Sequence, residues 1–125
     1  MPLKVLKVGI MPRDRFKERT LAIARGEYRP QADEPKVWFE SLRSFAEVLN
    51  EENQALLRLI LERQPQSLKE LEAATGRRSS NLSRTLRTME QYGLVEMVKV
   101  NRNVRPVVKA TDIRLDIRLD RSDAA

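Results

Sequence analysis

The sequence predicts a mainly α-helical fold that carries a small β-hairpin, and three observations support this prediction. Apolar residues recur at helical spacing through the middle of the chain, from about residue 41 to about residue 92. Two runs rich in β-branched residues, LVEMVKV and VRPVVKAT, follow and are separated by Asn-Arg-Asn. With 125 residues, the chain is long enough for one domain with a core and too short for two comfortable ones.

The N-terminal part predicts an arm, one helix and a linker. Residues 1–11 are expected to form a short strand or arm, because apolar residues dominate them and Pro12 ends them. Asp14 is expected to cap a helix that Gly26 ends. Two prolines and the lack of periodicity give residues 27–35 the composition of a linker.

Four further helices are expected before Gly93. The aromatic pair Trp38-Phe39 is expected to enter the first of them as a core anchor. Hydroxyl and amide side chains that can accept bonds from free backbone amides mark the helix starts. Ser67 and Glu70, in SLKE, have the spacing of a capping box, in which each side chain bonds the other residue's backbone amide. The expected starts of the four helices lie at Ser41, Asn50, Ser67 and Ser79.

The two β-branched runs predict a hairpin with its tip at residues 101–103, since asparagine tolerates left-handed backbone angles. Three helices, the last two joined by a turn that contains Gly76, followed by a hairpin make a winged helix-turn-helix. We expect that domain over residues 36–111. An N-terminal arm, helix and linker over residues 1–35 and a C-terminal β-strand and tail over residues 112–125 would flank it.

The predicted helix over residues 79–92 has two contrasting sides. Leu82, Leu86 and Met89 share one side, which is expected to face the core. The other side carries hydroxyl, amide and guanidinium groups instead of the Glu/Lys mixture of an ordinary solvated surface. Such groups suit the major groove of DNA, which displays hydrogen-bond donors and acceptors on the base edges. We therefore expect this side to contact double-stranded DNA.

Individual roles follow from residue type and position. Asn81 is suited to adenine and Arg84 to guanine, and each good pair contributes about 1–3 kcal/mol of discrimination. The arginines just before the helix are better placed for phosphates, together with the positive N-terminal end of the helix. Taken singly, each arginine has the alternative of a solvated surface charge, and Ser79 that of a helix cap. The predicted contacts here are Arg77, Arg78, Ser79, Ser80, Asn81, Ser83, Arg84 and Arg87.

The expected hairpin carries a second basic group. Arg102 lies in its tip, and Lys99 and Arg105 lie on either side along the chain. An arginine at such a tip can follow the DNA backbone or enter a narrow minor groove, where the negative potential is enhanced. We therefore add these three residues to the predicted DNA contacts.

The charge distribution favours a polyanionic partner. The net charge is +6, and residues 76–105 hold seven Lys/Arg against two acids. Basic blocks attract nucleic acid first and anionic membranes second, although many basic proteins bind neither. RNA is disfavoured because the chain lacks exposed aromatics that would stack on bases. With no apolar run of membrane-spanning length and no secretory leader, the chain is expected to be cytoplasmic.

Catalysis is not expected. The chain has no histidine and no cysteine, so the commonest general bases, nucleophiles and zinc ligands are absent. No serine lies in a nucleophile-elbow pattern, and there is no glycine-rich phosphate loop. We therefore expect neither an enzyme nor a protein that needs a cofactor or a metal.

Four segments of the sequence resemble one family of regulators. They are SLKELEAATGRRSSNLSRTLRTMEQYGLVE (67–96) and VRPVVKATDI (104–113), with TLAIARGEYRP (20–30) and PKVWFESL (35–42) upstream. They are similar to MarR-like winged-helix transcriptional regulators, and closest to a small prokaryotic branch of DNA-binding proteins. The resemblance implies a dimeric DNA-binding regulator, for example a repressor. The alternative is an antitoxin that binds a toxin encoded beside it through its flanking arms.

The segment DIRLDIRLD, residues 112–120, alternates polar and apolar residues with period two. If two copies paired antiparallel about a twofold axis at Ile117, Arg114 would face Asp120 of the partner subunit. Asp116 would then face Arg118 of the partner subunit, so every polar position would meet its opposite charge. We hypothesise that these residues form a dimer interface. The alternative is that the strand pairs within its own chain, beside residues 3–10.

Overall fold

The computed structural model describes residues 3–119, and within them it contains five helices and five strands. The helices are α1 (Arg13–Ala24), α2 (Leu42–Val48), α3 (Glu51–Arg63), α4 (Leu68–Thr75) and α5 (Ser79–Gln91). The strands are β1 (Val5–Ile10), β2 (Val37–Phe39), β3 (Val95–Val100), β4 (Asn103–Val108) and β5 (Asp112–Asp116). The predicted helices and hairpin are present, but 45% of the described residues are helical and 22% lie in strands, so the chain is α/β. The prediction of a mainly α-helical fold did not include the three-stranded sheet of β2, β1 and β5.

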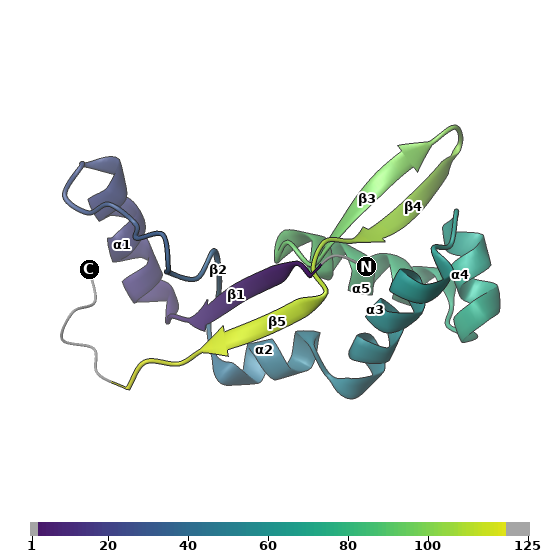
Figure 1. Cartoon of the computed structure of the whole chain (residues 1–125), viewed down its shortest axis with the longest axis horizontal. Coiled ribbons are helices and arrows are strands. Elements are labelled where there is room, and N and C mark those ends of the chain that lie inside the picture. Colours follow the sequence, from purple (N-terminus) through teal and green to yellow (C-terminus); the bar gives the residue numbers. More distant parts are fainter. Residues whose placement is uncertain (1–2, 120–125) are drawn as a thin grey trace.

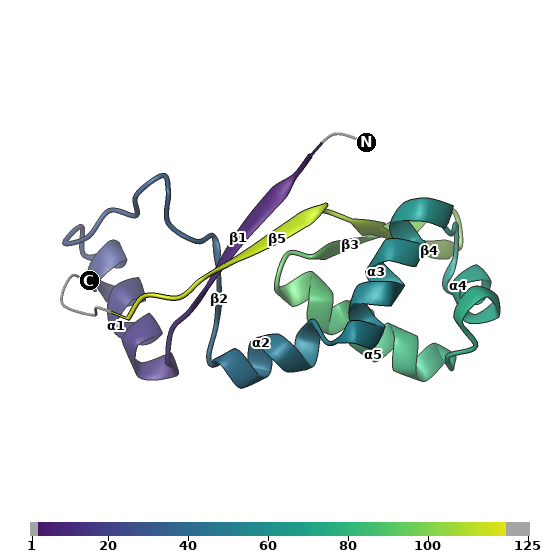
Figure 2. The same cartoon turned by 60° about the horizontal axis from the view of Figure 1, so that its bottom comes forward.

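The elements form an elongated arrangement (Figure 1). Helices α3, α4 and α5 gather at one end with the hairpin β3–β4, and α1 lies at the other end. The strands β1 and β5 run between the two ends, and the turned view in Figure 2 shows the same order. Hydrogen bonds join them with β2 in a three-stranded sheet of order β2-β1-β5, which is separate from the hairpin.

The core lies between the helices and the base of the hairpin. As predicted, Leu82, Leu86 and Met89 of α5 are buried, with 0%, 0% and 1% of their surface exposed. They pack with buried leucines and isoleucine of α3 and with Leu71 of α4 in one continuous cluster. The inward side of α5 is therefore fixed by packing, and its polar side faces outward.

The predicted caps Ser41, Asn50 and Ser67 are confirmed, and three details of the helix starts differ from the prediction. The first is Asp14, which lies in the first turn of α1, while Pro12 holds the cap position. The Asn50 side chain accepts a bond from the Asn53 amide at 2.8 Å, and Ser67 Oγ accepts one from the Glu70 amide at 3.1 Å. The Glu70 carboxylate, however, accepts from the Gln66 amide at 2.5 Å, so the predicted reciprocal capping box is wrong.

The N-cap of α5 also differs from the prediction. The cap position is Arg78, which has extended backbone angles and makes no side-chain capping bond. Ser79 is the first helical residue, so its predicted role as the cap is wrong. The shift follows from the preceding turn, where the Thr75 hydroxyl accepts a bond from the Arg77 amide at 3.1 Å.

The aromatic pair forms a strand instead of entering a helix, which corrects the prediction. Val37–Phe39 pairs parallel with β1, and Trp38 lies opposite Gly9. A run of β-branched and aromatic residues favours extended backbone. The expectation of a core anchor holds for Phe39, which is fully buried and stacks on Tyr92 with ring centroids 4.1 Å apart. Through this contact the sheet is joined to the end of α5.

The side chains of Trp38 and Pro35 leave no room for a Cβ atom at Gly9, and this predicts an effect on stability. A Cβ atom placed on Gly9 would lie 2.5 Å from Trp38 Cζ3 and 2.9 Å from Pro35 Cγ. We expect Gly9→Ala to lower the free energy of unfolding by about 1–3 kcal/mol, because the half-buried indole of Trp38 must move. Chemical denaturation measures the change. In a Trp38→Ala background the same substitution should cost clearly less, and an equal cost would contradict the steric explanation.

The C-terminal strand pairs within its own chain, as the alternative hypothesis of pairing beside residues 3–10 predicted. β5 lies parallel to β1, with Val5 opposite Asp112 and Val8 opposite Leu115. The strand ends at Asp116, so Ile117 and Arg118 follow it as non-strand residues, and Asp120 lies outside the described residues. Because β5 is at the end of the strand order β2-β1-β5, its second edge carries no strand within the described part of the chain.

The hairpin agrees with the prediction. β3 and β4 pair antiparallel, with Val100 opposite Asn103, so that only Asn101 and Arg102 form the turn. Asn101 has a φ of 57°, the left-handed conformation expected of an asparagine at the tip. Figure 1 shows that the hairpin projects away from the helices.

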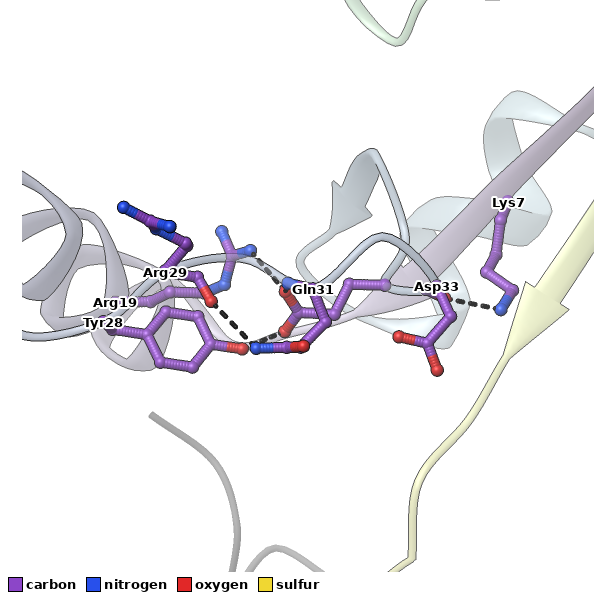
Figure 3. A network of polar contacts seen from close by, with 7 residues as sticks. Lys7, Arg19, Tyr28, Arg29, Gln31 and Asp33 are labelled. Carbon is purple, nitrogen blue, oxygen red and sulfur yellow. Dashed lines mark hydrogen bonds and ion pairs between the residues drawn. The ribbon is translucent and has the colours of Figure 1, made fainter.

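The segment between α1 and β2 is held to α1 through one half-buried acid, Glu34. The Glu34 carboxylate accepts hydrogen bonds from the Tyr28 hydroxyl and, at 2.6 Å, from the Gln31 amide, and Arg19 Nη2 lies 3.5 Å from it. Figure 3 shows Arg19, Tyr28 and Gln31 converging on this point. Burial by itself raises the pKa of Glu34, but these bonds and the Arg19 charge outweigh it and lower that pKa. The carboxylate therefore stays ionised at neutral pH and ties the linker to α1.

Within residues 3–119, no helix combines the length and the apolar character needed to cross a membrane.

Candidate nucleic-acid interface

The outward side of α5 presents most of the predicted contact residues together. Ser79, Ser80, Asn81, Arg84 and Arg87 are exposed, and Ser83 is half-buried at the margin of the core. At 3.6 residues per turn, Ser80, Arg84 and Arg87 fall opposite the buried side that contains Leu86. The sequence pattern and the observed burial therefore define the same polar surface, which we call the α5 outer face. Its members are Ser79, Ser80, Asn81, Ser83, Arg84 and Arg87.

The cations of this region are not neutralised within the protein. In residues 3–119, the side chains of Arg78, Arg84, Arg87, Lys99 and Arg102 make no ion pair, and all five residues are exposed. The two acids nearby have other roles. The Glu90 carboxylate accepts a bond from the Met97 amide at 3.1 Å, and Glu96 pairs with Lys109 at 3.2 Å. The region is therefore a positive surface that can receive an external anion.

Arg77 has a different environment from the one predicted. It is half-buried, and both of its terminal guanidinium nitrogens donate to Asn53 Oδ1 at 3.3 Å. The Asn53 amide group in turn donates to the Val48 carbonyl at 3.0 Å. Arg77 thus links the turn before α5 to the start of α3. These bonds hold the turn in position through Arg77. The partner, Asn53, was not predicted from the sequence.

Arg105 lies one strand pair further from the hairpin tip than Lys99. The turn uses only two residues, so Lys99 pairs with Val104 and Arg105 with Val98. The residue is half-buried, and its Nε atom is buried without a hydrogen-bond partner in the described part of the chain. Arg102 and Lys99 are exposed, as expected for the tip.

One further polar residue continues the α5 outer face. Gln91 is exposed and lies four residues after Arg87 and seven after Arg84, so it falls on the same side of the helix. The spacing was visible in the sequence, but Gln91 sits in the last turn, next to the expected helix end. Gln91 is therefore a candidate DNA contact that was not predicted from the sequence.

The hairpin is held in a fixed relation to α5. The Leu94 amide bonds the Met89 carbonyl at 3.0 Å, and Gly93 supplies the left-handed angle, φ 74°, that turns the chain into β3. The Glu90–Met97 bond adds a second link across the same corner. The exposed hairpin tip and the α5 outer face are therefore parts of one rigid unit.

Comparison with known proteins places this region in a family. Neither the curated proteins nor the solved structures contain a match to the chain. The sequence profile of the HVO_A0114 family matches residues 48–115, just over half of the chain. The match runs from the end of α2 through α3, α4, α5 and the hairpin into β5. The chain therefore belongs to the HVO_A0114 family.

Proposed function

We propose that the protein is a transcriptional regulator that binds double-stranded DNA as a winged helix-turn-helix, in the manner of the MarR-like regulators it resembles. Helices α4 and α5 form the helix-turn-helix, and β3–β4 forms the wing. The α5 outer face enters the major groove, where Asn81 and Arg84 read base edges. Lys99 and Arg102 of the wing follow the backbone or enter the minor groove. Bound in the cytoplasm over a promoter, its own included, the protein acts as a repressor.

One observation carries this proposal: the α5 outer face gathers exposed hydroxyl, amide and guanidinium groups whose cations have no acid to pair with in the described residues. A solvated helix surface usually alternates acids and bases at a spacing of three or four residues. Helix α5 contains a single acid, Glu90, which is bonded to the Met97 amide. DNA phosphates and base edges are the partners that match this chemistry.

Function as a dimer follows from this mode of reading DNA. Helix-turn-helix dimers place their two recognition helices about 34–36 Å apart, one turn of the double helix, on a roughly palindromic site. We therefore propose that two copies bind one operator.

The test is binding of the purified protein to a duplex from its own upstream region, followed by fluorescence anisotropy at several salt concentrations. We expect tighter binding than to a scrambled duplex of equal composition, with an affinity that falls as salt rises. Arg78→Ala should weaken binding to both duplexes alike and reduce the salt slope by about one. Binding that is absent, or that ignores both salt and sequence, would overturn the proposal.

A second candidate function, that of an antitoxin, is favoured by the surface of α1. This helix contains no buried residue, and Phe16 and Leu21 each expose 43% of their surface. A partner protein that buries these two apolar side chains would gain hydrophobic stabilisation. The test is co-expression with the product of the adjacent gene. Co-purification that is lost on Phe16→Ser with Leu21→Ser, while DNA binding persists, would support this function.

A further inference from the structure

The free edge of β5 has a defined set of backbone groups available for pairing. The Asp112 amide donates to the Lys4 carbonyl at 3.1 Å, so the backbone groups of Asp112 point toward β1. Because these groups alternate along a strand, those of Arg114 and Asp116 also point toward β1. The backbone groups of Ile113 and Leu115 therefore point to the free edge. A further strand that pairs with β5 must bond to these two residues.

The charges on β5 are suited to an antiparallel copy of the same strand. Arg114 and Asp116 are exposed and make no ion pair in residues 3–119. On the β1 side, Arg114 lies opposite Lys7, a residue of the same charge. If a second copy pairs antiparallel about a twofold axis at Leu115, Arg114 lies opposite Asp116 of the partner subunit, and Asp116 opposite the partner's Arg114. Both exposed charges then meet an opposite charge.

This register also agrees with the backbone geometry. Leu115 on the axis would exchange hydrogen bonds with the partner's Leu115, since its backbone groups face the free edge. Arg114 and the partner's Asp116 would then form a non-hydrogen-bonded pair. Such pairs bring the Cα atoms to about 4.5 Å, against about 5.5 Å for hydrogen-bonded pairs. The two charges would occupy the closer positions.

A pocket lies beside the same edge. It has a volume of about 300 Å³, with Phe45, Leu49, Leu57 and Ile113 among its apolar lining residues and Gln54 and Arg58 among its polar ones. No residue of β1 lines it. Figures 1 and 2 show β1 on one side of β5, and α2 and α3 on the other. The pocket therefore borders the edge that an added strand would occupy.

The residues that follow β5 supply side chains of the right kind for this pocket. Ile117 exposes 51% of its surface and Leu119 exposes 94%. In the register centred on Leu115, Ile117 of the partner subunit lies opposite Ile113. Residues directly opposite in an antiparallel pair point to the same face of the sheet. Ile117 of the partner subunit would therefore point toward the pocket that Ile113 lines.

The register centred on Ile117, expected from the sequence, fits less well. It puts the twofold axis beyond Asp116, where β5 ends, whereas the register centred on Leu115 keeps the axis and both charged residues within the strand. It also places Arg121 opposite Ile113, so that a second cation would approach Arg58 in the pocket lining.

We propose that two copies of the chain associate through antiparallel pairing of β5 about a twofold axis at Leu115, with Ile117 of each copy entering the pocket of the other. The two three-stranded sheets then form one continuous sheet. This interface would form the dimer that the proposed function requires. The residues that support the interface, however, lie outside the α5 outer face and the hairpin.

A charge exchange tests the register by sedimentation of the full chain without DNA. Arg114→Asp and Asp116→Arg each place like charges opposite each other, and each should raise the dimer dissociation constant by about tenfold. The double variant, Arg114→Asp with Asp116→Arg, restores opposite charges and should return the constant to near the wild-type value. In the register centred on Ile117 the double variant would remain weak. That outcome, or a monomeric wild type, overturns the proposal.

A second pair of variants tests the pocket. Ile117→Lys should weaken the dimer about tenfold or more, because a second cation would enter a pocket that Arg58 and apolar side chains line. Leu3→Lys, at an exposed leucine ahead of β1, is the matched control and should leave the dimer unchanged, and circular dichroism confirms that both variants fold. Equal effects of the two changes would contradict the proposal. If the dimer passes these tests but no DNA binds, only the proposed function fails.

Discussion

We expect Leu86→Ala to lower the free energy of unfolding by about 2–5 kcal/mol, the range found when a fully buried leucine is truncated. Leu86 has no exposed surface and packs in the cluster that joins α3, α4 and α5. The side chains around it cannot fully close the space that the lost atoms leave. Urea denaturation monitored by circular dichroism measures the change.

The neighbouring residue is the matched control. Arg87 is exposed on the α5 outer face and makes no ion pair in residues 3–119, so Arg87→Ala should alter stability by less than about 0.5 kcal/mol. The same substitution should weaken DNA binding. A stable Leu86→Ala protein beside an unstable Arg87→Ala protein would mean that α5 presents the opposite side to the core.

The second large effect concerns base reading. We expect Asn81→Ala combined with Arg84→Ala to remove about 2–6 kcal/mol of preference for the operator over scrambled DNA, from two contacts of about 1–3 kcal/mol each. Both side chains are exposed on α5 and lie outside the core cluster. The protein should therefore remain folded and keep its salt-dependent affinity for any duplex. Competition binding with the two duplexes measures the preference.

Arg43→Ala is the control for this experiment. Arg43 is an exposed arginine on α2 and is not a member of the α5 outer face, and its loss removes the same charge. It should leave the sequence preference unchanged. If Arg43→Ala reduces the preference as much as the double variant does, the assignment of Asn81 and Arg84 as base readers is wrong.

The structure was predicted best from the sequence where only residues close together in the chain decide the local conformation. The buried side of α5 could be predicted because Leu82, Leu86 and Met89 follow the helical period. The hairpin tip could be predicted because Asn101 tolerates the left-handed angle that a two-residue turn requires. In both cases the deciding residues lie within one turn or one hairpin of each other.

Contacts between distant segments were harder to predict. The strand at Val37–Phe39 forms because β1 offers it a parallel partner some thirty residues earlier, and three residues carry no clear period of their own. Arg77 bonds Asn53, which lies 24 residues before it, so its polar side chain resembled those that face solvent. The choice between self-pairing and pairing with β1 for residues 112–116 also depended on a distant strand.

The central claim is that the α5 outer face lies in the major groove of the bound DNA. The chain has no cysteine, so Gln91→Cys creates a unique attachment point for an iron–EDTA cleavage reagent at the end of that face. Bound to the upstream duplex, the labelled protein should cut a few adjacent nucleotides within the protected site. The same reagent on Arg43→Cys should leave the duplex uncut. Equal cutting from both positions, or none from Gln91→Cys while the protein stays bound, would contradict the claim.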